Sequence, residues 1–457
     1  MGKAVELNQT ACFCKMRRKI SQYVVLVPLD EQRGVLFSTL HRHLLTVSEE
    51  LWCALTQLVG VQQEHESIAM VATNDELKLL EDLHFLISPD QNEKLFARYL
   101  INMAKYNTSV MCLFISFTSR CNFKCSYCYQ DFRTSRPPQD LSRQKWQILL
   151  AFIRNRVLEF RVSDLSVALF GGEPLLNLEV VGRACEDLKA LEKEGCRVSL
   201  TLITNGSLLT LPVWKSLAPY VDLVQITLDG IKEVHDKHRA FANGHGSYDV
   251  LMTNIAALGQ EAYNKITLRV NVQPETLQGV YKLVELIAMS ELRSVLRAID
   301  FEEVFPTQRE VCAGACGIVK GSRLGKRLGE LFMTAAAFEL PLTRKFVFAP
   351  CVHSLANSFV VDEELRVYKC PGFLYWQPVG MVRKDSSIEL TPEWYEAVAY
   401  EPPCALNCVY GPICYGGCRA QAGGLDRVHC KKLHLDEIFG SLIKAYVLAK
   451  HVRKLHA

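Results

Sequence analysis

Three cysteines stand within eight residues of this 457-residue chain, at Cys121, Cys125 and Cys128, and they are its clearest candidates for chemistry. Four thiolates close a zinc or iron–sulfur site, whereas three thiolates on a four-iron cluster leave one iron open to a substrate or cofactor atom. The apolar run 114–118 before them predicts a buried strand. We therefore expect the cysteines in the loop at the carboxyl end of that strand, where α/β barrels and sheets place their chemistry.

The spacing Cys-x3-Cys-x2-Cys, with Tyr127 before the last cysteine, resembles the signature of the radical S-adenosylmethionine (SAM) enzymes. The resemblance implies that Cys121, Cys125 and Cys128 hold a [4Fe–4S] cluster. Its open iron would bind the amino and carboxylate groups of SAM and deliver the electron that breaks the C5′–S bond. The resemblance also places Tyr127 among the cofactor-binding residues. A half zinc site completed elsewhere in the chain is the alternative for the same spacing.

Composition narrows the class of protein. A net charge of +3 gives no electrostatic case for a nucleic acid or membrane partner, and no window of eighteen apolar residues predicts a membrane span. The first twenty residues lack the apolar core of a secretion signal, so we expect a cytoplasmic protein. Of the 18 cysteines, seven crowd into residues 351–430 and three into residues 121–128, a distribution that indicates cluster ligands rather than disulfides.

Apolar runs alternate with amphipathic segments between about residues 111 and 304, which predicts an α/β fold of parallel strands joined by helical crossovers. Six such units rather than eight predict a partial (β/α)6, TIM-like barrel that is open on one side. The expected strands are 113–118, 165–170, 198–204, 223–228, 266–272 and 297–304, and the expected helices include 142–160, 179–194, 248–258 and 277–289.

The second expected strand is followed by Gly171, Gly172, Glu173 and Pro174. Paired glycines let a backbone approach a ligand closely, and proline starts the next segment. In the radical SAM family a motif of this kind contacts the methionine amino group of SAM. The resemblance therefore implies that these four residues bind the cofactor.

Other candidates follow the later strands. By resemblance, Thr227 and Arg239 contact the ribose or carboxylate of SAM, and Asn271 on the fifth strand is a further candidate. The residues 204–206 are similar to a further segment of the family, but their types are explained equally well by a simple turn. His235 and His238 are compatible with either a surface or a site position.

The first hundred residues predict a separate small unit. A strand pair is expected at 23–29 and 34–37, with helices at 49–58 and 74–83. This order resembles the winged-helix-like modules that recognise the leader of a ribosomally made precursor peptide. Such modules let the leader extend the edge of a sheet. An N-terminal extension that only packs on the core is the alternative.

The C-terminal cysteines form the second strong pattern: a hairpin expected at 359–370 and a block of closely spaced thiols after it resemble the SPASM extension of radical SAM enzymes. The chain departs from the family pattern at Leu365, where glycine is usual, and in having three residues rather than two between the first cysteines of the block. Two zinc sites are the alternative. The resemblance implies two auxiliary [4Fe–4S] clusters, an inner one on Cys351, Cys370 and Cys418 and an outer one on Cys404, Cys408, Cys414 and Cys430.

The inner ligand set is one thiol short of four, so this cluster either has an open iron or borrows Cys312 or Cys316. The whole chain is then expected to contain three [4Fe–4S] clusters. The expected domains are a leader-recognition module at 1–106, a radical SAM barrel at 107–310, a bridging loop and helix at 311–345, and a SPASM domain with a C-terminal helix at 346–457.

These features predict a peptide maturase that forms a thioether cross-link in a leader-bearing precursor and takes electrons from a donor such as flavodoxin or ferredoxin. Oxidation of a sulfatase residue to formylglycine is one alternative, although enzymes of that kind carry aspartate where Pro371 follows Cys370. Carbon–carbon or carbon–oxygen cross-linking and epimerisation remain open. A zinc-binding protein without catalysis is the alternative from a different class.

Overall fold

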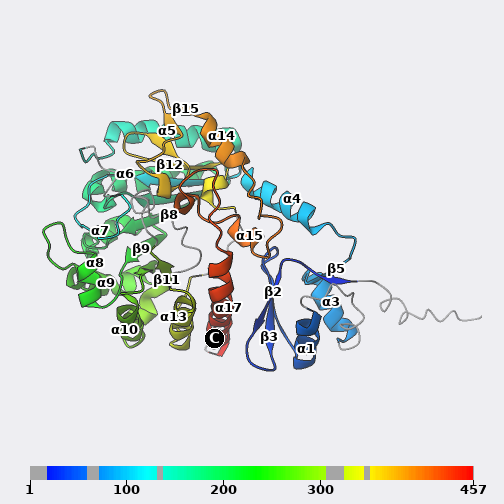
Figure 1. Cartoon of the computed structure of the whole chain (residues 1–457). Helices are drawn as coiled ribbons and strands as arrows, with labels where there is room; N and C mark the ends of the chain where they lie inside the picture. The colour runs from blue at the N-terminus through cyan, green and yellow to red at the C-terminus, as the bar shows by residue number, and fades with distance from the viewer. Residues whose placement is uncertain (1–17, 59–71, 131–136, 305–323, 344–349, 456–457) are drawn as a thin grey trace, which may run out of the picture. The chain divides into compact units, whose positions relative to one another are not determined.

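The computed structural model describes residues 18–58, 72–130, 137–304, 324–343 and 350–455, and their contacts form two compact units. The first unit comprises the described residues up to 102 together with 402–416. The second comprises those from 103 to 401 and from 417 onward. Figure 1 shows the elements of both units along the chain. Among the described residues, no helix combines the length and the apolar character needed to cross a membrane.

The second unit is built on parallel strands that lie side by side in chain order, which confirms the predicted α/β partial barrel. Each expected strand is present within three residues of its predicted ends. Because the strands are parallel, their carboxyl ends all lie at one edge of the sheet. The strands are β6 (Val110–Ser116), β7 (Asp164–Phe170), β8 (Arg197–Thr204), β9 (Leu223–Thr227), β10 (Ile266–Val272) and β11 (Leu296–Glu303).

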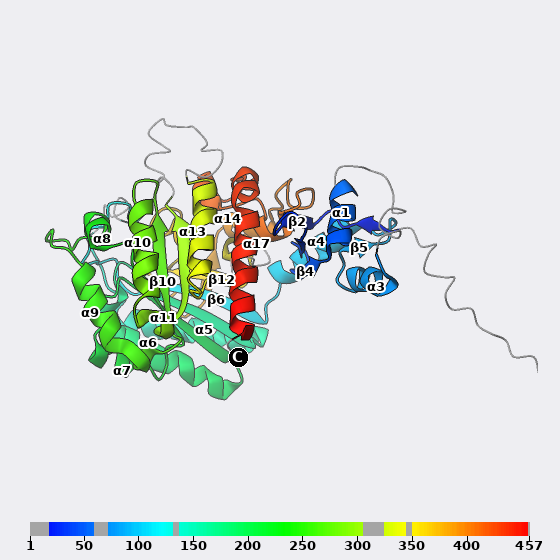
Figure 2. The same cartoon turned by 90° about the horizontal axis from the view of Figure 1, so that it is seen from below.

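Helices connect these strands. The Ser142 side chain caps α5 by accepting a hydrogen bond from the N–H of Lys145, and α9 has its predicted bounds. Figure 2 shows α10, α13 and α17 side by side. The helices are α5 (Arg143–Phe160), α6 (Leu178–Ala190), α7 (Leu211–Leu217), α8 (Lys232–His238), α9 (Tyr248–Leu258), α10 (Leu277–Ala288), α11 (Leu292–Val295), α13 (Lys326–Ala337) and α17 (Lys432–Leu455), with short 3-10 turns at Pro174–Asn177, Leu191–Glu194 and Gly259–Ala262.

Burial alternates along the strands, which separates an apolar face from a polar one. In β10, Leu268, Val270 and Val272 are fully buried, whereas Arg269 and Asn271, which alternate with them, are half-buried. Neighbouring side chains of a strand point to opposite faces of the sheet. The second face of β10 therefore carries polar side chains toward the edge where the cysteine loop lies.

The expected hairpin at 359–370 is present as β12 (Ser358–Val361) and β13 (Arg366–Tyr368), but it does not stand apart from the barrel. β12 pairs in parallel with β6, so the C-terminal region extends the barrel sheet to ten strands among the described residues. Leu365 in the hairpin turn has φ +65°, a left-handed conformation that favours glycine. This explains why glycine is usual at that position. The remaining elements here are β14 (Gly380–Val382), β15 (Ile388–Leu390), α14 (Pro392–Ala399), α16 (Arg419–Ala422) and 3-10 turns at Val352–Ser354 and Pro371–Phe373.

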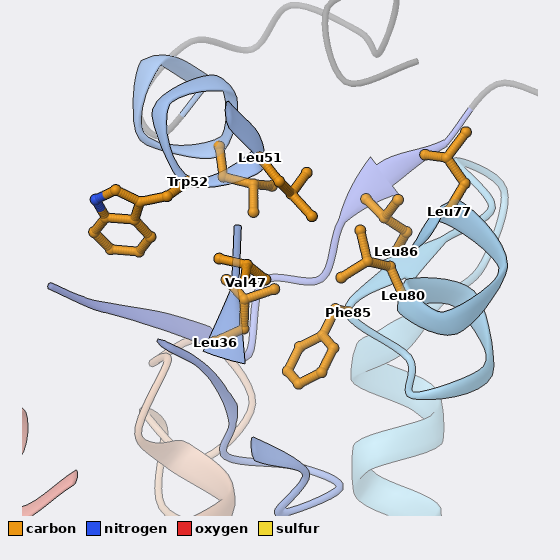
Figure 3. Close-up of a cluster of buried hydrophobic side chains, with 9 residues drawn as sticks. Leu36, Val47, Leu51, Trp52, Leu77, Leu80, Phe85 and Leu86 are labelled. Carbon is orange, nitrogen blue, oxygen red and sulfur yellow. The ribbon is translucent and has the colours of Figure 1, made fainter. Parts of the chain in front are cut away.

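The first unit contains the expected strand pair, as antiparallel β2 and β3, and a third strand, β4, completes the sheet. Its helices close a core that includes Leu36, Trp52 and Phe85 (Figure 3). A Cβ at Gly34 would lie 2.0 Å from the Trp52 ring, so only glycine fits beneath this tryptophan. The elements are β1 (Lys19–Ile20), β2 (Val24–Pro28), β3 (Gly34–Ser38), β4 (Leu44–Val47), α1 (Glu49–Leu58), α3 (Asn74–Asp82), β5 (Leu86–Ile87) and α4 (Glu93–Lys105).

A segment from the C-terminal cysteine block, residues 402–416, packs within this first unit. The Tyr23 hydroxyl donates to the carbonyl of Leu406 at 2.9 Å, and both residues lie in a second buried cluster with Ala97 and Tyr415. The segment includes the short helix α15 (Gly411–Cys414). The two compact units therefore do not follow the order of the chain.

Candidate active site

The cysteine loop after β6 is tied to the loop after β7 through backbone hydrogen bonds. The N–H of Gly172 donates to the carbonyl of Thr118, and that of Glu173 to the carbonyl of Arg120, each at 2.8 Å. A Cβ at Gly171 would lie 2.4 Å from the Thr118 oxygen, and one at Gly172 would lie 2.2 Å from the Arg120 oxygen. The glycine pair is therefore required where one loop packs against the backbone that leads into Cys121.

The segment after α8 holds the other side of the cysteine loop. The N–H of Lys124 donates to the carbonyl of Ala240, and that of Ser126 to the carbonyl of His238, each at 2.9 Å. The hydroxyl of Ser126 also lies 3.0 Å from Nδ1 of His238. His238 thus contacts the cysteine loop directly.

The loop after β8 holds the cysteine loop from a third direction. Nδ2 of Asn205 donates to Oδ1 of Asn122 at 2.8 Å, and Nδ2 of Asn122 donates to the Ser207 hydroxyl at 2.9 Å. Oδ1 of Asn205 also accepts from the N–H of Ser207, and Gly206 has φ +84°. The segment 204–206 is a turn, as its residue types indicate, and it also positions the cysteine loop.

Three predicted cofactor-binding residues meet at a buried carboxylate. The Tyr127 hydroxyl donates to Asp229 and accepts from Nη1 of Arg239 at 2.8 Å and from Nδ2 of Asn271 at 3.1 Å. The backbone N–H of Asn271 donates to Asp229 at 2.8 Å. Burial raises the pKa of Asp229, and the charge of Arg239 opposes this rise. Thr227 ends β9 two residues before Asp229 and is buried.

Asp229 was not among the predicted site residues, although it stands in the segment that supplied Thr227. It is only 1% exposed. Arg239 is also buried, at 7% exposed. Its Nε lies 4.0 Å from the Asp229 carboxylate and has no hydrogen-bond partner among the described residues. The sequence did offer one signal for Asp229. An aspartate follows the fourth strand, at the edge of the sheet where the other candidate residues lie.

His235 lies inside the protein rather than on its surface. Its Nδ1 accepts from the N–H of Asp229 at 3.3 Å, and its Nε2 lies 3.0 Å from the hydroxyl of Ser247. Burial, together with the smaller effect of the positive charge of Arg239, lowers the pKa of His235 to about 3. The neutral imidazole therefore helps to hold Asp229 in place through the backbone N–H of that residue.

The Glu173 side chain is fully buried, and its hydrogen bonds stay within the protein. Its carboxylate accepts from the hydroxyl of Thr204 and the N–H of Asn205, each at 2.7 Å. Burial raises the pKa of Glu173 to about 7, and these donors oppose the rise. The side chain joins the loops after β7 and β8. Pro174, also buried, starts the 3-10 turn that follows.

The thiols of the cysteine loop suit an iron–sulfur cluster. Cys121 is accessible to solvent as a residue. The protein packed around its thiol, together with the charges of Glu173, Cys125 and Cys128, raises the pKa of this thiol to about 12. The N–H of Phe123 donates to the sulfur of Cys121 at 3.4 Å. Soft thiolates grouped in this way, with a backbone N–H directed at sulfur, are the donor set that a [4Fe–4S] cluster needs.

A second group of thiols lies elsewhere in the same unit. Burial raises the pKa of Cys370, and the charges of Cys418 and Cys351 raise it further, while the N–H groups of Gly372 and Phe373 oppose the rise. A Cβ at Gly372 would lie 2.5 Å from Cβ of Ala420, two residues after Cys418. The three thiols predicted for the inner cluster are thus electrostatic neighbours, with N–H groups directed at one sulfur.

The predicted outer set is divided between the two compact units, with Cys404, Cys408 and Cys414 in the first and Cys430 in the second. The N–H of Cys408 donates to the carbonyl of Cys404 at 3.1 Å, as in a tight turn. Cys312 and Cys316 lie outside the described residues. Within the part of the chain that the structure describes, no group of three or more His, Cys, Asp or Glu is arranged to hold a single metal ion. A four-iron cluster takes each thiolate on a separate iron, so its ligands stand farther apart than those of one ion.

Comparison with known proteins gives a family match for the barrel: residues 115–287 match the model of the radical SAM superfamily. The cysteine-type anaerobic sulfatase-maturating enzyme of Clostridium novyi is 24% identical over 343 residues, which are 69% of this chain and 90% of that protein. The radical SAM cyclopropyl synthase TigE of Paramaledivibacter caminithermalis is 22% identical over 259 residues, covering 51% of this chain and 54% of that protein.

Among solved structures, native anSMEcpe with bound AdoMet has a TM-score of 0.56 at 16% identity, covering 76% of this chain and all of that one. The same protein solved with AdoMet and the Cp18Cys peptide gives the same TM-score and identity. At this level of identity the similarity shows the fold.

Proposed function

Because the chain is a radical SAM enzyme that uses a [4Fe–4S] cluster and SAM, we propose that it forms a thioether cross-link in a ribosomally synthesised precursor peptide. The cluster and SAM together supply a 5′-deoxyadenosyl radical. A carbon of the peptide gives a hydrogen atom to this radical. The same carbon would bond to a cysteine sulfur of the peptide with release of the thiol proton, and an auxiliary iron–sulfur cluster held by the C-terminal cysteines would supply the acceptor for the remaining electron.

The residues of the chain bind and orient the reactants. We assign the cluster to Cys121, Cys125 and Cys128. We assign the contacts with SAM to Tyr127, Gly171, Gly172, Glu173, Pro174, Thr227, Arg239 and Asn271. The three surrounding loops hold the cysteine loop in one position, so the reacting groups need little reorganisation. The buried network around Asp229 fixes Tyr127 and Arg239 at the edge where the strands end.

The mutual charge effects among the thiols of Cys351, Cys370 and Cys418 are the observation that carries the proposal. Three thiolates on a four-iron cluster leave one iron able to bind a substrate thiolate. A cysteine of the peptide held in this way would be placed for carbon–sulfur bond formation. We assign a further, outer cluster to Cys404, Cys408, Cys414 and Cys430, and an external donor such as flavodoxin or ferredoxin as the source of electrons.

We assign leader recognition to the first unit. Its sheet ends at β2 on one side and β4 on the other. An extended peptide can add to such an edge through backbone hydrogen bonds. The peptide-bound structure of anSMEcpe supports a peptide as the class of substrate.

Formylglycine formation on a sulfatase is the second candidate, and the relative from Clostridium novyi favours it. Pro371 argues against this candidate. It follows Cys370 directly, at the position where enzymes of that kind carry aspartate. Proline has no ionisable side chain, and here it starts a 3-10 turn. We therefore prefer thioether formation to formylglycine formation, with carbon–carbon or carbon–oxygen cross-linking and epimerisation as further alternatives.

Coexpression with each short, cysteine-containing reading frame encoded beside the gene tests the proposal. A thioether product loses two hydrogen atoms and one free thiol, whereas an epimerised product keeps its mass. The matched control is the same peptide with each cysteine replaced by serine, which should stay unmodified. Modification of a sulfatase cysteine with no change in any short peptide would favour formylglycine formation instead.

A further inference from the structure

A lysine is completely buried beside the proposed inner cluster. Lys369 directly precedes Cys370 and is 0% exposed. Its ammonium group donates to the carbonyl of Leu355 at 2.8 Å and lies 4.5 Å from the centre of the Trp394 ring. Burying a cation is costly unless nearby groups compensate for the loss of water.

The anionic groups that favour the charged form of this lysine are thiolates. The charges of Cys351 and Cys370 act on Lys369 and favour its protonated form. A cluster bound by these thiolates would carry additional negative charge in the same place. Lys369 is thus a fully buried basic residue that is adjacent in the chain to a proposed cluster ligand.

A second buried cation approaches from another element. Arg419 follows Cys418 and is 3% exposed. Its Nη1 donates to the carbonyl of Arg427 at 2.9 Å, and its guanidinium lies 5.1 Å from the centre of the Tyr400 ring. The charge of Arg419 lowers the pKa of the Cys351 thiol. A guanidinium keeps its proton in proteins, so this positive charge is permanent.

We propose that the buried cations of Lys369 and Arg419 stabilise the reduced state of the iron–sulfur cluster on Cys351, Cys370 and Cys418, and so equip that cluster to accept an electron. This inference rests on the proposed ligand set. A [4Fe–4S] cluster becomes more negative by one charge on reduction, and nearby positive charge in a water-poor environment favours that state. The arrangement thus fits a cluster that takes the electron released when the peptide is oxidised.

Another lysine of the same unit provides a matched control. Nζ of Lys265 donates to the carbonyls of Ala218 and Val221 at 3.1 and 2.9 Å and lies 5.4 Å from the centre of the Trp214 ring. Like Lys369, it is held by backbone carbonyl groups and a tryptophan ring. Its charge has no effect among those that shift the pKa of Cys351 or Cys370. Lys265→Met removes a comparable charge at a distance.

The test is an EPR-monitored redox titration of the reconstituted full-length protein with Cys121, Cys125 and Cys128 changed to alanine, so that only auxiliary clusters contribute. We expect Lys369→Met and Arg419→Gln each to lower the reduced-to-oxidised ratio of one cluster at least tenfold at a fixed potential, a shift of about 59 mV for one electron. Lys265→Met should leave the titration unchanged.

Unchanged titration curves in both variants, with the iron retained, would overturn the inference while leaving the ligand assignment intact. If both neutral variants lose the cluster while Lys265→Met keeps it, the cations serve assembly and the inference is again wrong. Failure of the ligand assignment itself is detected separately. In that case Cys370→Ala and Cys418→Ala would keep the full iron content.

Discussion

Tyr127 and Asp229 are 102 residues apart in the chain, and the tyrosine hydroxyl donates a hydrogen bond to the aspartate carboxylate. The bond joins the cysteine loop after β6 to the carboxyl end of β9. Arg239 donates to the same hydroxyl from the segment after α8. The position of the cysteine loop is therefore set by a buried polar network as well as by its own turn.

Replacing Asp229 by asparagine should weaken SAM binding by about tenfold, because the loss of a buried charged hydrogen-bond partner costs about 1–3 kcal/mol. Tyr127 and Arg239 would no longer be held by a carboxylate. The measurement is the dissociation constant of SAM for the reconstituted protein, together with iron content, which should stay normal. Asp249→Asn, at a surface pair with Lys232, is the control. Wild-type SAM affinity in Asp229→Asn would show that the network does not position the site.

Changing Cys121, Cys125 and Cys128 together to alanine should remove about a third of roughly twelve irons per chain, since three four-iron clusters are expected. SAM cleavage should disappear because SAM is assigned to the open iron of this cluster, whereas the open iron of the inner cluster is assigned to the substrate thiolate. Iron analysis and 5′-deoxyadenosine formation under reducing, anaerobic conditions report the two effects. Full cleavage by this variant would be incompatible with the assigned cluster site.

The buried His235 should make the folded protein less stable in mild acid. Its pKa is lowered from about 6.5 in the unfolded chain to about 3 in the folded one, so the unfolded chain binds the proton more readily in between. Its stabilising effect is therefore complete above about pH 6.5 and declines as the pH falls toward 3. By linkage the loss is about 2 kcal/mol between pH 6.5 and pH 5.

Thermal unfolding of wild type and His235→Gln at pH 7 and pH 5 measures this effect, because glutamine cannot take up the proton. The variant should show a smaller fall in Tm between the two pH values. His245→Gln, at an exposed position, should behave like wild type. Equal pH dependence in wild type and His235→Gln would mean that His235 takes up its proton without opening the fold.

Deleting the residues up to Tyr106 should lower iron content as well as peptide modification. The first unit supplies Tyr23, Ala97 and Ile101, which pack against the segment that carries Cys404, Cys408 and Cys414. Removing these residues exposes apolar surface around that segment and should impair the outer cluster. Tyr23→Phe, which removes only the hydroxyl bond to Leu406, should cost about 1 kcal/mol and keep the iron. A truncated protein with full iron content would show that the segment folds without this packing.

The barrel strands were predictable from sequence because each is an apolar run of standard length between turn residues, and α9 follows helical spacing over its whole length. The cysteine triad and the Gly171–Pro174 motif were identifiable for the same local reason. The hairpin at β12 and β13 was predicted as well, from the run 359–370 that ends at Cys370.

Long-range pairings were not predictable. Nothing in Ser358–Val361 indicates that it pairs with β6 from more than two hundred residues earlier, and this pairing places the hairpin beside the barrel. The burial of Asp229 and His235 likewise depends on Arg239 and Ser247 from separate loops. Leu365 is a case in which local structure accounts for a departure from the family. Glycine is usual at this position, and Leu365 adopts the left-handed conformation that glycine favours.

Transfer of deuterium tests the central claim most directly. A precursor peptide found by coexpression is made with deuterium on the carbon to be joined and incubated with the reconstituted enzyme, SAM and reductant. The account predicts that deuterium appears in 5′-deoxyadenosine, in step with formation of a thioether-linked peptide that has lost two hydrogens. Formation of the product with no deuterium in 5′-deoxyadenosine would contradict hydrogen abstraction from the peptide, and with it the proposed reaction.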